Sequence, residues 1–73
     1  MEKNWLKVAT YTDALIGELN KQLLEEQGIA AVLINKQDSS FIVGRIELFV
    51  HQDNESAALA LLTAEETKGE DEN

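Results

Sequence analysis

The stretch LLEEQGIAAVLI, residues 23–34, joins the end of a helical pattern to a short apolar run. Gly28 is typical of the left-handed residue that follows the last turn of a helix. The run from Ile29 to Ile34 is short and rich in branched side chains, which favours a buried strand. The stretch therefore predicts a helix that leads directly into a strand.

Residues 4–10, toward the N-terminus, have the alternating pattern of a first strand. Such alternation directs one set of side chains to the core and the other set away from it. The expected inward set includes Leu6 and Val8. The expected outward set is Trp5, Lys7 and Ala9.

The residues between this strand and Gly28 predict the first helix. Thr12 offers a hydroxyl that caps its start, and Asp13 falls in the first turn, where the helix dipole favours a carboxylate. Gly17 would let the helix approach the sheet closely, at a cost of about 1 kcal/mol relative to Ala. The residues expected to form the apolar face of this helix are Leu15, Ile16, Leu19 and Leu23.

A hairpin and a third strand follow the second strand. The polar residues 35–40 predict the hairpin loop. The third strand is expected from Phe41 to Val50, with Gly44 marking a bulge or bend inside it. The side chains expected to face inward are Ile46, Leu48 and Val50. Those expected to face outward are Arg45, Glu47 and Phe49.

The last element is a second helix, capped by Asp53 or Asn54 and running from Glu55 to about Glu66. Its apolar stripe contains Ala58, Leu61 and Leu62. Residues 67–73 are acidic and contain no apolar side chain, which predicts a disordered tail. The sequence thus predicts a single domain over residues 1–66 and an acidic tail over 67–73.

The predicted order is β-α-β-β-α. A right-handed crossover places the first two strands parallel, and the third strand inserts between them, antiparallel to both. Both helices then cover one face of a three-stranded sheet. This is an α+β, ferredoxin-like arrangement without its usual last strand, which leaves the first strand as an edge.

The composition excludes several functions. The chain has 73 residues, a net charge of −8 and no cysteine, so it can form neither a disulfide nor a thiolate zinc site. Its longest apolar runs, 29–34 and 57–62, are far below the roughly 20 residues of a membrane span. The absence of cysteine fits a reducing cytoplasm, where we expect the protein. An acidic chain is repelled by nucleic acid and by anionic lipid, so we expect it to bind neither.

The side of the sheet away from the helices is the candidate interaction surface. Its expected residues are Trp5, Lys7, Arg45, Glu47 and Phe49, joined by Val32 and Ile34 if the register allows. An uncovered face with two aromatic side chains beside charged ones favours self-association or a protein partner. The alternative is a solvated face that tolerates two aromatics.

Asn35 and Lys36 suggest a different function. With Arg45 they could contact an anionic metabolite at a subunit interface, which would make the chain a small-ligand sensor. The alternative is that Asn35 and Lys36 only form the turn after the second strand.

Two chemical interpretations are weaker. His51, Asp53 and Glu55 could suggest metal ligands, but a strand end followed by a helix cap explains them better, because a strand-to-helix transition does not naturally bring three such side chains together. Ser39 and Ser40 in the loop could act as nucleophiles only with His51 within about 3 Å. We therefore expect no catalytic residue, no metal and no cofactor, and the chain is not expected to be an enzyme.

Several parts of the chain form a familiar combination, namely residues 5–11, Ala14, and residues 23–29, 31–36, 46–50 and 57–62. Together they resemble a family of small bacterial proteins of unknown function that are described as signal-transducing. The family is grouped by fold with the nitrogen-regulatory P-II proteins. The resemblance implies a ferredoxin-like, P-II-like domain that acts in regulation or recognition, and it supplies no catalytic residue. P-II proteins bind nucleotide and 2-oxoglutarate between subunits and carry a long regulatory loop. This chain has only a short hairpin loop and no basic cluster to hold a triphosphate, so nucleotide binding is not implied.

Overall fold

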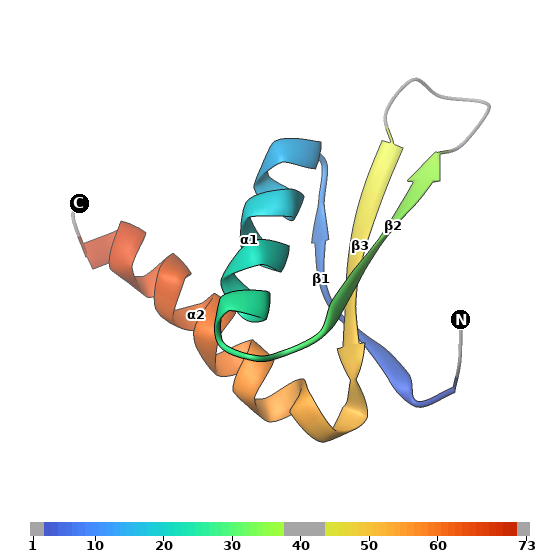
Figure 1. The fold of residues 1–73 in the computed structure, drawn as a ribbon. Helices are drawn as coiled ribbons and strands as arrows, with labels where there is room; N and C mark the ends of the chain where they lie inside the picture. Colours follow the sequence, from blue (N-terminus) through green and yellow to red (C-terminus); the bar gives the residue numbers. More distant parts are fainter. Residues whose placement is uncertain (1–2, 38–43, 72–73) are drawn as a thin grey trace.

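The chain forms an α+β fold in which two helices lie on one side of a small sheet (Figure 1). The structure is a computed structural model that describes residues 3–37 and 44–71. The elements are β1 (Trp5–Tyr11), α1 (Ala14–Glu26), β2 (Ala31–Gln37), β3 (Gly44–His51), a 3-10 turn η1 (Gln52–Asn54) and α2 (Glu55–Asp71). The β-α-β-β-α order is therefore confirmed.

The three strands form an antiparallel sheet in the order β1-β3-β2. The third strand lies between the first two, as the sequence predicts, and β1 is an edge strand. Both helices contact the sheet from the same side, with α1 over all three strands and α2 over β1 and β3. In the part of the chain that the structure describes, no helix covers the other face of the sheet.

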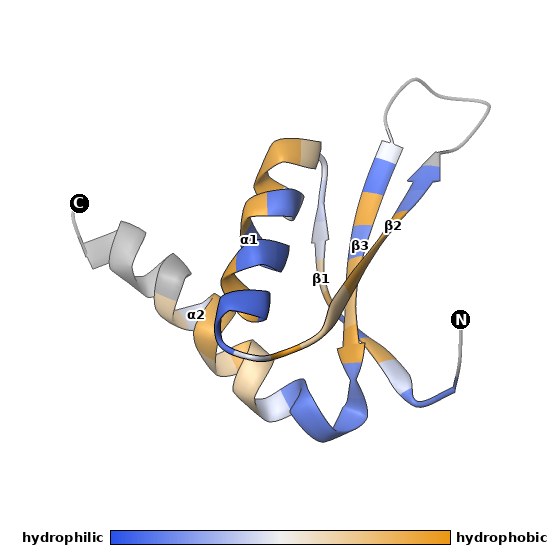
Figure 2. Ribbon diagram, in the orientation of Figure 1, coloured by the Kyte–Doolittle hydropathy of each residue, from blue (hydrophilic) through white to orange (hydrophobic). Residues whose placement is uncertain are grey.

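The register assigns the side chains to two faces. Residues paired across antiparallel strands share a face, and successive residues alternate. The hydrophobic residues of β3, namely Ile46, Leu48 and Val50, are buried beneath the helices. Figure 2 shows the resulting alternation of hydrophilic and hydrophobic residues along β3. The outward facing of Arg45, Glu47 and Phe49 follows from the same alternation.

A β-bulge interrupts β1 between Lys7 and Ala9. Before the bulge Lys7 pairs with Phe49, and after it Ala9 pairs with Leu48, so the extra residue changes the facing of the strand. The prediction that Ala9 faces outward is therefore wrong, because Ala9 and Val8 both pack against the core. Gly44, where the sequence predicts a bulge or bend, starts β3 in regular register with Gln37, and the residues that precede it lie outside the described residues.

The two ends of α1 follow ordinary capping chemistry. Asp13, rather than Thr12, is the N-cap, and its Oδ1 accepts the Leu15 amide at 2.8 Å. At the other end Gly28 has φ +83°, which confirms the predicted left-handed residue. The Gly28 amide donates to the Glu25 carbonyl and the Ile29 amide to that of Leu24, which is the Schellman pattern.

The orientation of α1 differs from the prediction. Gly17 and Leu24 are buried against the sheet, whereas Leu15, Ile16 and Leu19 are 65%, 43% and 52% exposed. The physical reason is Gly17. Because it has no side chain, this side of the helix can lie close to the sheet, as expected, and the leucine-rich side turns outward.

The core consists mainly of Leu24, Leu48 and Val50, which are completely buried between the sheet and the helices. The second helix contributes Ala58 and Leu62 to it, which confirms the predicted stripe. This helix continues past its expected end at Glu66 to Asp71, into the segment for which the sequence predicts a disordered tail. No helix in the described part of the chain has the length and apolar character needed to span a membrane.

The hairpin begins later than the sequence predicts. Asn35 and Lys36 belong to β2, which continues to Gln37 because β3 offers pairing partners up to Gly44. The interpretation of Asn35 and Lys36 as a turn is therefore wrong. The predicted strand residues 41–43 and the loop residues 38–40 lie outside the described residues.

Candidate functional site: the open sheet face

We use the term open sheet face for the side chains that project from the sheet on the side opposite the helices. Paired residues share a face of the sheet. The register therefore places there all seven residues that the sequence analysis named for this surface, together with three others. The members of the open sheet face are Trp5, Lys7, Thr10, Val32, Ile34, Lys36, Arg45, Glu47, Phe49 and His51. All five expected interaction residues thus share one surface, and Val32 and Ile34 join it.

The apolar part of this face lies toward the start of β1. Trp5 pairs with His51, and their rings meet edge to face with centroids 6.0 Å apart. Phe49 lies in the next row between Lys7 and Val32. The Trp5 and Phe49 side chains are half-buried, and Val32 is 37% exposed. The face therefore presents aromatic and aliphatic surface without a helix to cover it.

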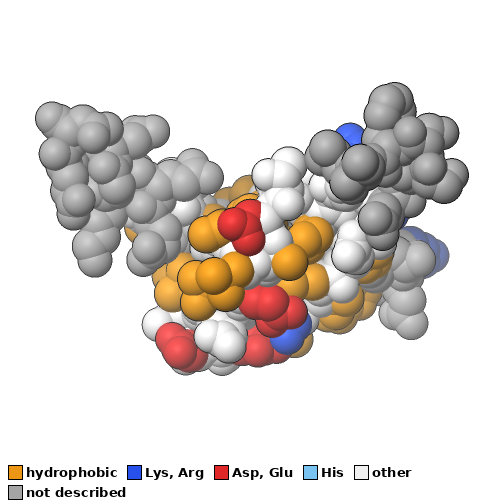
Figure 3. All heavy atoms as spheres, turned by 90° about the horizontal axis from the view of Figure 1, so that it is seen from above, with side chains coloured by type: hydrophobic (Ala, Val, Ile, Leu, Met, Phe, Trp, Pro, Cys, Tyr) orange, Lys and Arg blue, Asp and Glu red, His pale blue; other side chains and the backbone are white. Residues whose placement is uncertain are grey.

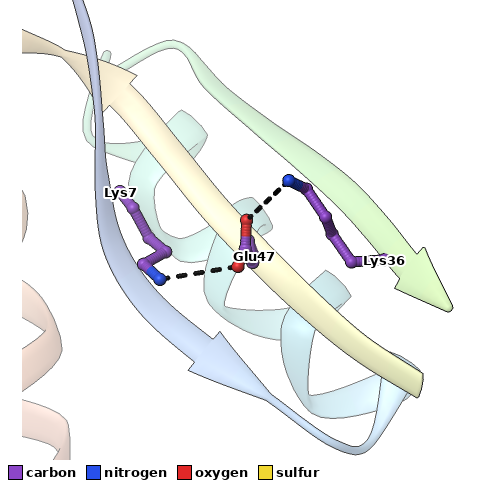
Figure 4. Close-up of polar contacts among 3 residues, drawn as sticks. All are labelled: Lys7, Lys36 and Glu47. Atoms are coloured by element: carbon purple, nitrogen blue, oxygen red, sulfur yellow. Dashed lines mark hydrogen bonds and ion pairs between the residues drawn. The ribbon is translucent and has the colours of Figure 1, made fainter. Parts of the chain in front are cut away.

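The charged part is centred on Glu47. The Glu47 side chain is only 11% exposed, although it projects from the side of the sheet opposite both helices. Its Oε2 lies 3.4 Å from Lys7 Nζ on β1, and its Oε1 lies 3.9 Å from Lys36 Nζ on β2 (Figure 4). The two lysines thus bracket the carboxylate from the flanking strands and compensate its buried charge.

A further cation makes this face positively charged. Arg45 on β3 lies directly opposite Lys36 on β2, and like charges in this position repel. Arg45 is exposed and takes part in no ion pair among the described residues. Three cations therefore share the face with the single carboxylate of Glu47, while the whole chain carries −8. The open sheet face is a basic surface on an acidic protein.

Asn35 does not belong to this surface. It pairs with Ile46 on the helix side of the sheet, whereas Lys36 and Arg45 point to the other side. Two shallow hollows of about 210 and 170 Å³ lie beside Asn35, both lined also by Ala14 and Ile46. Within one chain the sheet thus separates Asn35 from the two cations with which it was expected to hold an anion.

The region around His51 has a structural role. The Asp53 amide donates to His51 Nδ1 at 3.1 Å, which caps the 3-10 turn that leads into α2. Because a backbone amide can only donate, Nδ1 is an acceptor in this contact. The same nitrogen lies 3.5 Å from the Asp53 carboxylate and cannot donate to it while it accepts the amide. In residues 3–37 and 44–71, no three acidic, histidine or cysteine side chains are grouped to hold a metal ion.

The proposed nucleophiles Ser39 and Ser40 lie outside the described residues. On the helix side, a groove of about 360 Å³ opens between α1, α2 and β1. Its lining residues are Val8, Ala9, Tyr11, Ile16, Asn20, Leu59, Leu62 and Thr63. The lining contains the hydroxyls of Tyr11 and Thr63 and no carboxylate, histidine, lysine or cysteine.

The outward side of α1 is a second surface, which the sequence interpretation missed. We call it the α1 crest and define it by Leu15, Glu18, Leu19, Gln22 and Glu26, all of them exposed. Figure 3, which looks down on the end of the molecule at the top of Figure 1, shows hydrophobic and acidic side chains side by side. The available signal was Gly17, since a glycine in a helix marks the side that lies closest to its neighbour.

One ion pair borders the α1 crest. Lys21 Nζ lies 3.0 Å from Glu25 Oε2 one helical turn away. This hydrogen bond raises the pKa of Lys21, and the negative charges of Glu25 and Glu18 act in the same direction, against partial desolvation. Glu26 takes part in no ion pair among the described residues. The crest is thus both apolar and acidic.

Comparisons with protein-family models, with curated proteins and with solved structures find no match to this chain. The fold and the two surfaces are consequently the basis for any assignment of function.

Proposed function

We propose that this chain is a non-enzymatic recognition domain that binds protein, either another copy of itself or a different chain, through the open sheet face. The observation that carries the proposal is the composition of that face, which places Trp5, Phe49 and Val32 beside three cations on the side of the sheet opposite both helices. Apolar surface next to charged side chains is typical of protein interfaces.

The residues of the face divide into two roles. Trp5 and Phe49 are half-buried, so they can serve as anchors that lose little side-chain freedom on binding. Lys7 and Arg45 orient the partner by charge, and Glu47 holds Lys7 in place. The buried carboxylate already has its cations, so a docked partner does not leave it without a compensating charge.

The structure of β1 favours the face over the strand edge as the binding surface. A bulge interrupts the edge strand between Lys7 and Ala9, and bulges hinder the addition of another strand. The face has no such interruption along β3 and β2, whose register is regular.

The regulatory role is supported by the resemblance given above. We assign the fold to the ferredoxin-like class without its last strand, since β3 lies between two parallel strands and both helices share one side. A bacterial, cytoplasmic, P-II-like signal-transducing domain fits this arrangement. Because one fold serves many functions, the proposal depends on the open sheet face rather than on the fold.

A second candidate function is an anion sensor, favoured by the placement of Lys36 opposite Arg45. An anionic metabolite would relieve the repulsion between these cations. A thermal-shift series with ATP, 2-oxoglutarate and inorganic phosphate tests it. A rise in Tm that Arg45→Gln abolishes supports the sensor, and no rise with any of these anions removes it.

The main proposal is tested by affinity capture with three forms of the chain. The wild type is compared with Val32→Glu, which places a charge in the apolar part of the face, and with Ala60→Glu, which changes an exposed site on α2. We expect the wild type and Ala60→Glu to retain a bound protein, which can be a further copy of the chain itself. We expect Val32→Glu to lose it. Identical retention by all three forms would contradict the proposal.

A further inference from the structure

We propose that the partner of the open sheet face is the α1 crest of a second copy of this chain, so that copies associate head to tail. This inference rests on the proposed function and names the partner of the same site. It is carried by a complementarity between two surfaces of one molecule, which lie on opposite sides of the fold.

The first part of the complementarity is charge. The open sheet face carries Lys7, Lys36 and Arg45 against Glu47. The helix α1 carries three glutamates against Lys21, and Lys21 is already paired with Glu25. The two surfaces thus have opposite net charges of two units each. Contact between them brings opposite charges together, whereas two copies of the sheet face in contact would bring three cations against three.

The second part is apolar surface. Leu15 and Leu19 are 65% and 52% exposed on the crest and lie one helical turn apart, so they form a continuous apolar patch of the kind that marks interaction sites. On the open sheet face Val32 and Phe49 offer apolar surface of comparable kind. Apolar side chains from a helix pack well on the pleated surface of a sheet, and Leu24 of α1 packs in this way on the other side of the same sheet.

The dimensions also agree. A helix of 13 residues is about 20 Å long, and strands of 7 and 8 residues span about 25 Å. One helix therefore lies along the open sheet face without passing its ends. Contact with one helix is small compared with a standard protein interface, so we expect weak, concentration-dependent association.

The arrangement has a consequence for assembly. The contact is heterologous, because the sheet face of one copy meets the helix crest of the next and each copy keeps one free surface of each kind. Association therefore does not stop at a dimer unless a ring closes. In each contact the open sheet face gains a helical layer, which converts two layers into three.

The test uses two variants that each disable one surface. The sheet variant is Val32→Glu with Arg45→Glu, which removes the positive character of the face and places a carboxylate opposite Lys36. The crest variant is Leu15→Glu with Leu19→Glu. Both altered surfaces are acidic, so they repel each other in a mixture. Ala57→Glu with Ala60→Glu on α2 is the matched control, and circular dichroism checks that all forms fold.

Molar mass is measured by light scattering over a concentration series. For the wild type and the control we expect a mass that rises through dimer without a plateau and falls when salt is raised from about 0.05 to 0.5 M, because salt screens the charge contacts. Each variant alone remains monomeric. The equimolar mixture of the two variants forms a 1:1 complex that stops at twice the monomer mass, because only one intact pair of surfaces remains.

Two outcomes would overturn the inference and leave the proposed function intact. If the crest variant associates like the wild type while the sheet variant does not, the sheet face pairs with itself. If the wild type is monomeric throughout, yet capture of another protein still depends on Val32, the partner is a different chain. If the wild type is monomeric and capture is independent of Val32, the inference and the proposed function both fail.

Discussion

Gly17 of α1 lies against Ile46 of β3 so closely that a Cβ atom added to the glycine would stand 3.3 Å from Cγ2 of Ile46. Tyr11 and Leu33 side chains lie at 3.5 and 3.6 Å from the same position. This contact fixes which side of α1 meets the sheet, and it thereby determines that Leu15 and Leu19 form an exposed crest.

Enlarging Gly17 should therefore move the helix away from the sheet. We expect Gly17→Leu to lower the free energy of unfolding by about 2 kcal/mol, because the added carbons have no room beside Ile46. Gly17→Ala should change it by less than about 1 kcal/mol, since the gain in helix propensity offsets the crowding. Urea denaturation measures both. Equal stability of the Leu variant and the wild type would contradict the close approach.

The leucines of α1 should differ sharply in their contribution to stability. Leu24 is completely buried, so we expect Leu24→Ala to cost about 3 kcal/mol. Leu15→Ala and Leu19→Ala remove exposed side chains and should each cost no more than about 0.5 kcal/mol. The measurement is denaturant unfolding of dilute monomer. Comparable losses at all three positions would mean that α1 is oriented differently.

The end of α1 should be sensitive to Gly28 for a reason unrelated to packing. Its φ of +83° is unfavourable for any residue with a Cβ, and no atom lies within 4 Å of the position that a Cβ would occupy. We expect Gly28→Ala to cost about 1 kcal/mol through backbone strain alone. Gly28→Asn should cost less than Gly28→Ala, because asparagine tolerates this conformation better. The reverse order in thermal unfolding would contradict this explanation.

The charges of Lys7, Lys36 and Glu47 should behave as a coupled set. Lys7→Met and Lys36→Met leave Glu47 with one cation each, and we expect each to cost about 0.5 kcal/mol because both lysines are half-exposed. The double variant should cost more than the sum, since it leaves a nearly buried carboxylate without a cation. In a Glu47→Gln background the coupling should disappear. Strict additivity in the original background would show that the lysines do not compensate Glu47.

The sequence predicts the strand order, the helix stop at Gly28 and the facing of β3, because these depend on local patterns and on the handedness of the crossover. It does not predict the facing of Ala9, because the bulge depends on pairing with β3. It also selects the wrong side of α1, since leucines normally mark the buried side and only the packing of Gly17 reverses this.

The sequence likewise predicts only part of the open sheet face. Alternation alone places Trp5, Lys7 and Phe49 on one face. The bracketing of Glu47 by Lys7 and Lys36 requires the register of three strands, which no local pattern contains. The same register separates Asn35 from Lys36, because β2 continues where a turn was expected.

The most direct test of the open sheet face is a concentration series of two-dimensional NMR spectra of the isotope-labelled wild-type chain. If the face is the binding surface for a second copy, the amide resonances of Val32 and Phe49 shift with concentration, together with those of Leu15 and Leu19 on the crest. If the shifts instead map only to the groove residues Leu59 and Thr63, while Val32 and Phe49 stay unchanged, the chain associates through its helices and the account of the open sheet face is wrong.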